Sequence, residues 1–125
     1  MKIFTVEEAN QTLPRARQIM AKIQQAHRRV ASMGNEARLA AAAADGGGGG
    51  MVGGVHYVRA LMELTARTND LDELGIQLKD YERGLIDFPC LRDGRVVLLC
   101  WQMGEGDSIE WWHEMDAGFG GRQRL

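Results

Sequence analysis

The dipeptide Asp93-Gly94 stands between two runs rich in β-branched, aromatic and leucine residues, Leu85–Leu91 and Arg95–Met103. Asp-Gly between such runs is a strong signal for a β-hairpin with a two-residue turn, since both turn positions tolerate a positive φ angle. A two-residue turn also fixes the register of the two strands. Counting outward from it, the sequence predicts antiparallel pairing in which Asp87 faces Cys100.

This register divides the hairpin into two faces, because neighbouring residues of a strand point to opposite sides. One face is almost wholly apolar and is expected to pack on helices: Ile86, Phe88, Cys90, Val97, Leu99 and Trp101. The second face is too apolar to meet water, so a C-terminal tail, a second subunit or a ligand must cover it. It consists of Leu85, Asp87, Leu91, Val96, Leu98, Cys100 and Gln102. The two cysteines lie on opposite faces, so no disulfide is expected, in agreement with a reducing compartment.

A third antiparallel strand is expected over Ser108–His113, after a turn of glycines and acidic residues. A helix from Ser108 to Gly118 is the less favoured alternative, because two tryptophans stand side by side. The loop length leaves two registers open, and a shift of one residue turns every side chain to the other face. The two registers bring different residues to the Asp87/Cys100 face: Glu110, Trp112 and Glu114 in one, Trp111 and His113 in the other.

The first part of the chain has a helical period. Thr5-Val6-Glu7-Glu8 forms a capping box, with Phe4 placed to pack on Ala9. Apolar residues then recur at alternating spacings of four and three, as in a coiled coil: Ala9, Leu13, Ala16, Met20, Ile23 and Val30. We expect a helix over residues 1–44 that Pro14 kinks or splits. His27 fills one seam position, and a partly buried histidine beside another polar group is favoured there over a metal ligand.

A stretch of alanines and glycines follows, and 48–53 formally matches the dinucleotide fingerprint GxGxxG. No strand precedes this match, so residues 45–54 are interpreted as a flexible, glycine-rich tip. A second helix is expected over 55–75, with Gly75 as its C-cap. Its apolar stripe consists of Val55, Val58, Leu61, Met62, Leu64, Leu71 and Leu74. The two helices then form an antiparallel hairpin.

These elements predict an α+β fold, in which a long antiparallel helical hairpin precedes a small three-stranded antiparallel sheet. Residues 84–125 form the β-ribbon and tail, and residues 1–125 form a single domain. The length of 125 residues, with 45% hydrophobic and 26% charged, agrees with one globular domain. No apolar run approaches the roughly 18 residues of a membrane span, and the start has no signal-peptide core, so a cytoplasmic location is expected.

Charge is distributed unevenly along the chain. Residues 1–50 hold seven Lys/Arg and four Asp/Glu, whereas residues 51–125 hold eight and thirteen. The basic residues of the first helix indicate a solvent-exposed face or a binding surface for an acidic partner. Nucleic-acid binding is disfavoured, because no motif of basic and aromatic residues accompanies them.

Candidate ligand-binding residues gather in the last forty positions: Asp87, Cys100, Trp101, His113, Glu114, Asp116 and Arg122. Asp87, Cys100 and His113 are ligand types for zinc or another divalent transition metal, although no CxxC or HExxH spacing is present. A Cys-His nucleophile is less favoured, because Cys100 would lie in mid-strand rather than at a helix N-terminus. Arg122 and Arg124 can clamp a carboxylate or phosphate, but an ion pair of Arg122 with an acidic residue such as Asp116 or Asp87 is the favoured interpretation.

Three segments, FTVEEANQTLP, GLIDFPCLRDGRVVLLCWQMGE and WHEMDAGFGGRQ, resemble an uncharacterised prokaryotic domain-of-unknown-function family. The resemblance covers roughly residues 3–30 and 60–124. It implies the order of helices and ribbon and the location of a site. It implies no reaction.

Two functions are compatible with the sequence. The favoured one is a non-enzymatic interaction module that self-associates as a homodimer, because the apolar surface exceeds what one small chain covers. The alternative is a small-molecule or metal-binding site on the Asp87/Cys100/His113 face. A distance within about 5 Å between His113 and Asp87 or Cys100 would favour this site, because charges at that range shift each other's pKa.

Overall fold

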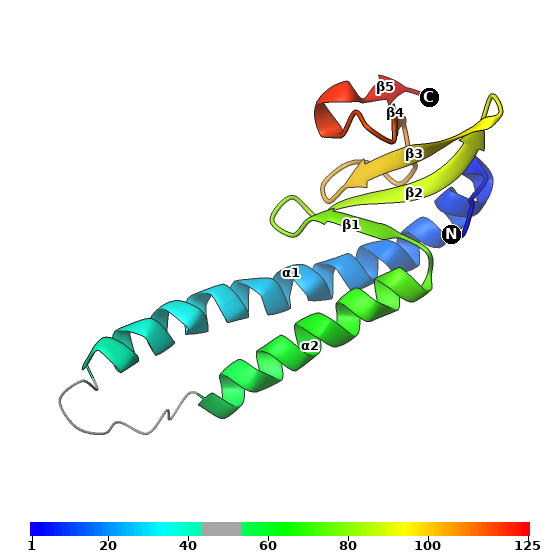
Figure 1. Cartoon of the computed structure of the whole chain (residues 1–125). Helices are drawn as coiled ribbons and strands as arrows, with labels where there is room; N and C mark the ends of the chain where they lie inside the picture. The colour runs from blue at the N-terminus through cyan, green and yellow to red at the C-terminus, as the bar shows by residue number, and fades with distance from the viewer. Residues whose placement is uncertain (44–53) are drawn as a thin grey trace.

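The computed structural model describes residues 1–43 and 54–125, with side chains for 1–35 and 54–125. In this part of the chain two helices are followed by five strands and one short 3₁₀ helix. The elements are α1 Val6–Ala43, α2 Gly54–Glu73, β1 Gln77–Asp80, β2 Leu85–Arg92, β3 Arg95–Gln102, β4 Trp111–Glu114, η2 Phe119–Gly121 and β5 Gln123–Arg124. The predicted glycine-rich tip, 45–54, lies outside the described residues except for Gly54, which begins α2. Figure 1 shows α1 and α2 side by side, with the sheet over one end of the hairpin.

The predicted capping box at the start of α1 is confirmed. The amide of Thr5 donates to Glu8 Oε1 at 3.2 Å, and the amide of Glu8 donates to Thr5 Oγ1 at 3.0 Å. Phe4 before it is buried and meets Phe88 edge-on at 5.3 Å between ring centroids. The alternative that Pro14 splits the helix is wrong, since α1 is continuous through it. Buried Leu13 and Ala16 hold both sides of the proline in the same core.

The predicted C-cap of α2 is also confirmed. Gly75 has a φ angle of +85°, and its amide donates to Asp72 O at 2.9 Å. A Cβ atom at this position would lie 2.7 Å from Cβ of Lys2. Glycine is therefore required both by the backbone angle and by the approach of the N-terminal segment.

The apolar stripe predicted on α2 is buried over only part of its length. Leu71 is fully buried and Leu64 and Leu74 pack against the core, but the first half of the stripe is exposed. The exposed fractions are 62% for Val55, 52% for Val58, 37% for Leu61 and 66% for Met62. The residue buried in this half is Ala60, which lies two positions from Val58 and Met62 and so points to nearly the opposite side of the helix.

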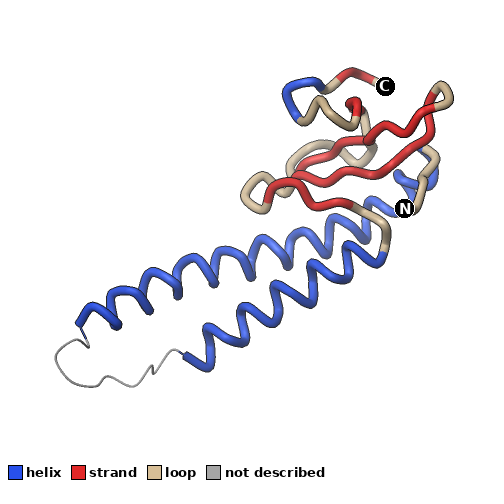
Figure 2. The backbone as a smooth tube through the Cα atoms, viewed as in Figure 1, coloured by secondary structure: helices blue, strands red, loops and turns tan. Residues whose placement is uncertain are grey.

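The sheet has five antiparallel strands in the order β1-β2-β3-β4-β5, and Figure 2 shows them as one curved layer. The prediction of three strands was incomplete, because β1 and β5 were missed. Both are short, and the sequences QLKD and QR offer too few apolar residues to show alternation.

The hairpin register predicted from Asp93-Gly94 is confirmed. Asp87 pairs with Cys100 and Leu91 with Val96, and the two turn residues have φ angles of 50° and 78°. The third strand takes the register that aligns Cys100 with Trp111. Trp111 and His113 therefore share the Asp87/Cys100 face, and the helical alternative for this segment is wrong.

The apolar face of the hairpin packs on α1, as predicted. The six apolar residues of this face and Trp112 form one buried cluster with five of the regularly spaced apolar residues of α1: Ala9, Leu13, Ala16, Met20 and Ile23. Two contacts also attach the β1–β2 turn to the middle of α1. Gln24 Nε2 donates to the backbone oxygens of Tyr81 and Glu82 at 3.2 and 2.9 Å, and His27 stacks on Tyr81 at 4.8 Å. Among the described residues, no helix is long and apolar enough to cross a membrane.

Candidate functional site

Three polar side chains from three different strands meet inside the sheet end of the molecule. Asp87 comes from β2, Cys100 from β3 and His113 from β4. Their exposed fractions are 1%, 0% and 3%. One donor atom from each residue lies within 4.8 Å of the other two. Asp87, Cys100 and His113 are called the buried triad below.

The sheet register explains why these residues meet. Asp87 stands directly opposite Cys100, and His113 stands opposite Leu98, which is two residues before Cys100 on the same face. Diagonal neighbours of this kind are within reach of a long side chain. The imidazole of His113 extends across β3, and its Nε2 lies 3.0 Å from Asp87 Oδ2.

The hydrogen bonds define where the protons of the pair lie. His113 Nδ1 is 2.7 Å from the backbone oxygen of Glu114, and a carbonyl oxygen only accepts. Nδ1 therefore carries a hydrogen and donates it. The short contact between Nε2 and Asp87 Oδ2 needs a second proton, which makes the pair either imidazolium with carboxylate or imidazole with carboxylic acid.

Burial has the largest effect on the pKa values of Asp87 and Cys100. It raises the pKa of Asp87, while the neighbouring His113 and the Cys100 thiol lower that pKa in part. Burial, and next the charge of Asp87, raises the pKa of Cys100 to about 12. Cys100 is thus a neutral thiol near pH 7, which does not support the Cys-His nucleophile, because that chemistry needs a thiolate.

One polar atom of the triad is left without a partner. Asp87 Oδ1 is buried and has no neighbour in hydrogen-bond geometry among the described residues. Buried polar atoms are nearly always hydrogen-bonded, because an unpaired one keeps its full desolvation cost. The carboxylate therefore has one oxygen available for a further interaction.

The C-terminal tail packs on part of this face of the sheet, which is one of the three covers that the sequence left open. Arg122 follows η2, and its guanidinium stacks on Trp111 and Phe119 at 4.9 and 4.8 Å from the ring centroids. The same guanidinium donates to both carboxylate oxygens of Glu105 at 2.8 Å. The predicted ion pair of Arg122 with an acidic residue is confirmed, but the partner is Glu105 and not Asp116 or Asp87, which the sequence suggested as examples.

Three other candidate residues lie apart from the triad. Trp101 belongs to the helix-facing side, where its indole Nε1 donates to the backbone oxygen of Gly106 at 2.9 Å. Glu114 points to the hairpin end and forms an ion pair with Arg95. Asp116 is exposed in the turn after β4. The structure thus unites three of the seven candidates and places Arg122 over them.

Two residues beside the triad were not among the candidates. Glu105 neutralises Arg122, and its place in a turn gave no signal of that pairing. Trp111 supplies the ring on which Arg122 stacks, and only the correct register of the third strand would have identified it.

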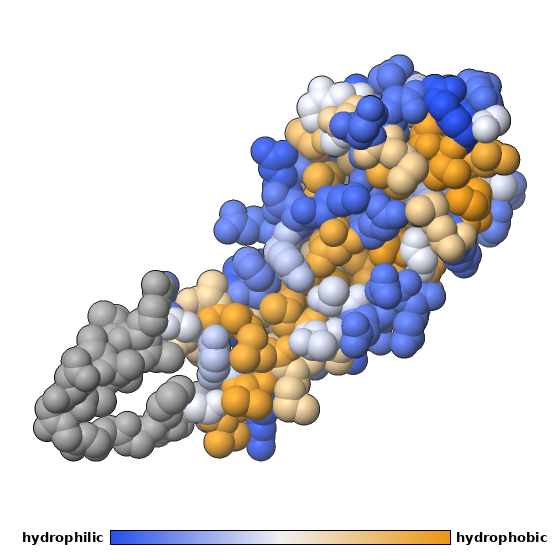
Figure 3. All heavy atoms as spheres, viewed as in Figure 1, coloured by the Kyte–Doolittle hydropathy of each residue, from blue (hydrophilic) through white to orange (hydrophobic). Residues whose placement is uncertain are grey.

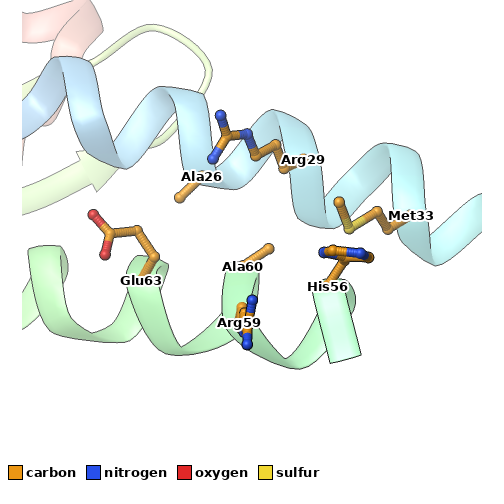
Figure 4. A pocket seen from close by; sticks show the side chains of 7 residues that line it. All are labelled: Ala26, Arg29, Met33, His56, Arg59, Ala60 and Glu63. Carbon is orange, nitrogen blue, oxygen red and sulfur yellow. The ribbon is translucent and has the colours of Figure 1, made fainter. Parts of the chain in front are cut away.

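One groove, of about 380 Å³, lies between the two helices of the hairpin and apart from the triad. Figure 4 shows Glu63 extending from α2 toward α1, whereas Arg29 lies along α1, and Ala26 and Ala60 line the space between the helices. The remaining lining residues are Met33, His56 and Arg59. The groove is open to solvent, and its lining does not converge on a common point as the triad does.

Comparison with known proteins supports the resemblance seen in the sequence. A family model described as an uncharacterized conserved protein, DUF2203, matches residues 2–125. No curated protein and no solved structure matches the chain. The match covers the helical hairpin, the sheet and the tail together.

Proposed function

We propose that this chain, which belongs to the uncharacterised conserved family DUF2203, is an interaction module that forms a homodimer through α2. The observation that carries the proposal is the exposed half of the α2 stripe, called the distal stripe below: Val55, Val58, Leu61 and Met62. Figure 3 shows apolar side chains on the visible face beside the grey atoms. Contiguous apolar patches of this kind mark interaction sites on soluble proteins.

The spacing of the distal stripe suits packing against another helix. Val55, Val58 and Met62 are separated by three and then four residues, which is the spacing of a two-stranded helical seam. The side of α2 that contains Ala60 and Leu71 is already buried. Among the residues whose side chains are described, the opposite side of α2 is exposed and can receive a partner without a change in the fold.

A second copy of the chain, aligned in parallel, is the partner that fits best. The distal stripe occupies only the first half of α2, so parallel alignment places the whole stripe of one copy on that of the other. If the two α2 helices overlapped along their full length in antiparallel orientation, the distal stripe of one copy would instead face Asn69 and Glu73 of the other, which are exposed and polar. A two-fold interface of this kind is self-complementary, as most homodimer interfaces are.

A cytoplasmic location is part of this proposal. Its support is the pair of free cysteines, Cys90 and Cys100, both buried and on opposite faces of the sheet. The alternative function, binding of a small molecule or metal at the buried triad, concerns the other end of the molecule. It is supported by the 3.0 Å contact between His113 and Asp87.

Light scattering during size-exclusion chromatography tests the dimer directly. The full chain is expected to run as a dimer in the micromolar range, and Met62→Glu is expected to run as a monomer with an unchanged circular dichroism spectrum. Gln25→Glu places the same charge on an exposed position of α1 and is expected to remain a dimer. A native chain that stays monomeric and freely soluble at such concentrations would overturn the proposal.

A cysteine placed in the stripe tests the parallel alignment. Val58→Cys is expected to form a disulfide between copies under mild oxidation, because a parallel two-fold seam brings this position next to itself. Gln25→Cys is the matched control, and the native cysteines are buried. Cross-linking of Gln25→Cys at the same rate would show that collisions, not the seam, join the chains.

A further inference from the structure

We propose that Asp87, Cys100 and His113 form a binding site for one divalent transition-metal ion, and that zinc fits it best. The three side chains bring carboxylate, sulfur and imidazole donors to one point, and their donor atoms lie within 4.8 Å of one another. The inference does not depend on dimer formation, because the triad lies in the sheet and the distal stripe lies on α2.

The separations are close to those a zinc ion requires. With Zn–S of about 2.3 Å and Zn–N or Zn–O of about 2.0 Å, donor atoms of a tetrahedral site lie roughly 3.3 to 3.6 Å apart. His113 Nε2 and Asp87 Oδ2 are 3.0 Å apart, and the widest separation in the triad is at most 4.8 Å. Closing that gap requires side-chain movements of about 1 Å, within the range of small χ rotations.

Two of the three ligands are already oriented for the ion. The donation from His113 Nδ1 to the backbone oxygen of Glu114 fixes the ring and turns Nε2 toward the triad. Metal-binding histidines characteristically have such a backbone partner on the other nitrogen. Asp87 also has the buried Oδ1 without a hydrogen-bond partner, which an ion would satisfy.

The charges around the triad permit a bound cation. A divalent ion, one thiolate, one carboxylate and a neutral imidazole sum to zero, which limits the cost of burial. The positive charge of Arg122 lowers the pKa of Cys100, and this charge is balanced by the Glu105 carboxylate, to which Arg122 donates two hydrogen bonds. The charge of Lys79 lowers the pKa of Asp87, but Lys79 is exposed, so water screens this interaction.

The donor set also selects the kind of metal. Sulfur and imidazole favour zinc, cobalt and related ions, whereas magnesium and calcium prefer oxygen donors alone. Three protein ligands leave a fourth position of a tetrahedral ion for water or another small ligand. Since each ligand comes from a different strand, the ion would also link β2, β3 and β4.

Binding must displace two protons. The Cys100 thiol loses one when its sulfur becomes a ligand, and the His113–Asp87 pair loses the proton shared between Nε2 and Oδ2. The metal–nitrogen, metal–oxygen and metal–sulfur bonds replace these two bonds to hydrogen, and no electron is transferred. Proton release on metal binding is the general consequence of ligands that bind in their deprotonated forms.

Cobalt provides a direct probe of the sulfur ligand. The full chain is freed of metal with a chelator and titrated with Co²⁺, while its absorption spectrum is recorded. We expect saturation at one equivalent, with the charge-transfer band of a cobalt–thiolate bond, and displacement of cobalt by Zn²⁺. Absence of a stoichiometric signal from the correctly folded chain would overturn the proposal.

The two native cysteines provide a matched pair of variants. Cys100→Ser is expected to lose the charge-transfer band and at least tenfold in Zn²⁺ affinity. Cys90→Ser changes the same side chain on the opposite sheet face, and is expected to keep both. Equal losses in the two variants would contradict the assignment.

The remaining ligands are tested with near-isosteric variants. Asp87→Asn and His113→Gln are each expected to weaken Zn²⁺ binding by tenfold or more, and circular dichroism before titration identifies any variant that does not fold. His56→Gln, at an exposed histidine on α2, is the control for adventitious surface binding. The proposal fails if this control loses the bound ion while a folded His113→Gln retains it. The Zn²⁺ affinity of each variant is measured by competition with a chromophoric chelator. This readout reports metal binding directly and not the folding stability of the variant.

Discussion

The two ends of this molecule reverse the usual distribution of polar and apolar residues. At the sheet end, Asp87 and His113 are almost fully buried and lie 3.0 Å apart. At the free end of the hairpin, the distal stripe exposes four large apolar side chains. Buried polar groups and exposed apolar patches are the two departures from an ordinary protein surface that carry information. Here the buried polar pair lies at the sheet end of the molecule, and the distal stripe lies at the free end of the hairpin.

The comparison shows that the two ends need different explanations. The buried triad at the sheet end is enclosed by its own chain, since Arg122 of the tail packs on Trp111 and pairs with Glu105 beside it. The hairpin end is not closed by any described residue. A site within one copy is therefore proposed for the first end, and contact between copies is proposed for the second.

The largest expected effect comes from breaking the buried pair. Asp87→Ala removes the partner of a buried imidazole and should destabilise the metal-free chain by about 3–5 kcal/mol. Urea unfolding followed by circular dichroism measures this loss. A change below about 1 kcal/mol would show that His113 finds another partner or that water enters the triad.

The second expected effect compares one side chain at each end. Leu99 is fully buried in the sheet, so Leu99→Ala should cost about 2–5 kcal/mol. Val58→Ala should change stability by about 0.5 kcal/mol or less, because Val58 is half exposed in one copy. Both are measured in the Met62→Glu background, where dimer formation does not contribute. Equal losses would show that α2 buries its distal stripe within one chain.

A smaller effect is expected at the first turn of α1. Thr5→Ala removes the side-chain oxygen that accepts from the amide of Glu8 and should cost about 1 kcal/mol. Thermal unfolding measures the difference. Thr12→Ala is the control, because its hydroxyl bonds within the helix and caps no free amide. An equal loss in both variants would remove the capping explanation.

The smallest effect concerns the ion pair of Arg95 with Glu114. Hydrogen bonding to Arg95 lowers the pKa of Glu114. The pair therefore adds stability above the ordinary pKa of a glutamate, and this contribution is lost as pH falls through the lowered pKa. Unfolding free energies of the native chain and Arg95→Gln should converge in acid and differ slightly near neutral pH. A difference that grows as pH falls would contradict this sign.

Local signals in the sequence predicted the elements that depend on neighbouring residues. The capping box, the C-cap at Gly75 and the register around Asp93-Gly94 all follow from short-range geometry, and all are confirmed. The buried triad follows partly from the same register, which placed Asp87 opposite Cys100. His113 could be added only after the loop before β4 was known, because one residue decides its face.

Features that depend on distant contacts were not predictable in this way. The spacing of Val55, Val58 and Met62 reveals an apolar face but not what covers it, so the sequence did not show which half of the stripe is exposed. The pairing of Arg122 with Glu105 joins a tail to a turn, and no local pattern specifies it. The short strands β1 and β5 form by backbone pairing with the longer strands β2 and β4, and their own sequences do not indicate this pairing.

The attachment of the β1–β2 turn to α1 has a consequence for dynamics. Gln24 and His27 hold Tyr81 at the midpoint of the helix. The residues of α1 that belong to the core cluster all precede Gln24, and the last of them is Ile23. Backbone amides before Gln24 should exchange with deuterium only when the whole domain unfolds, whereas later amides should exchange through local opening. The helix is thus continuous in its hydrogen bonds, yet divided into a slow-exchanging and a fast-exchanging half.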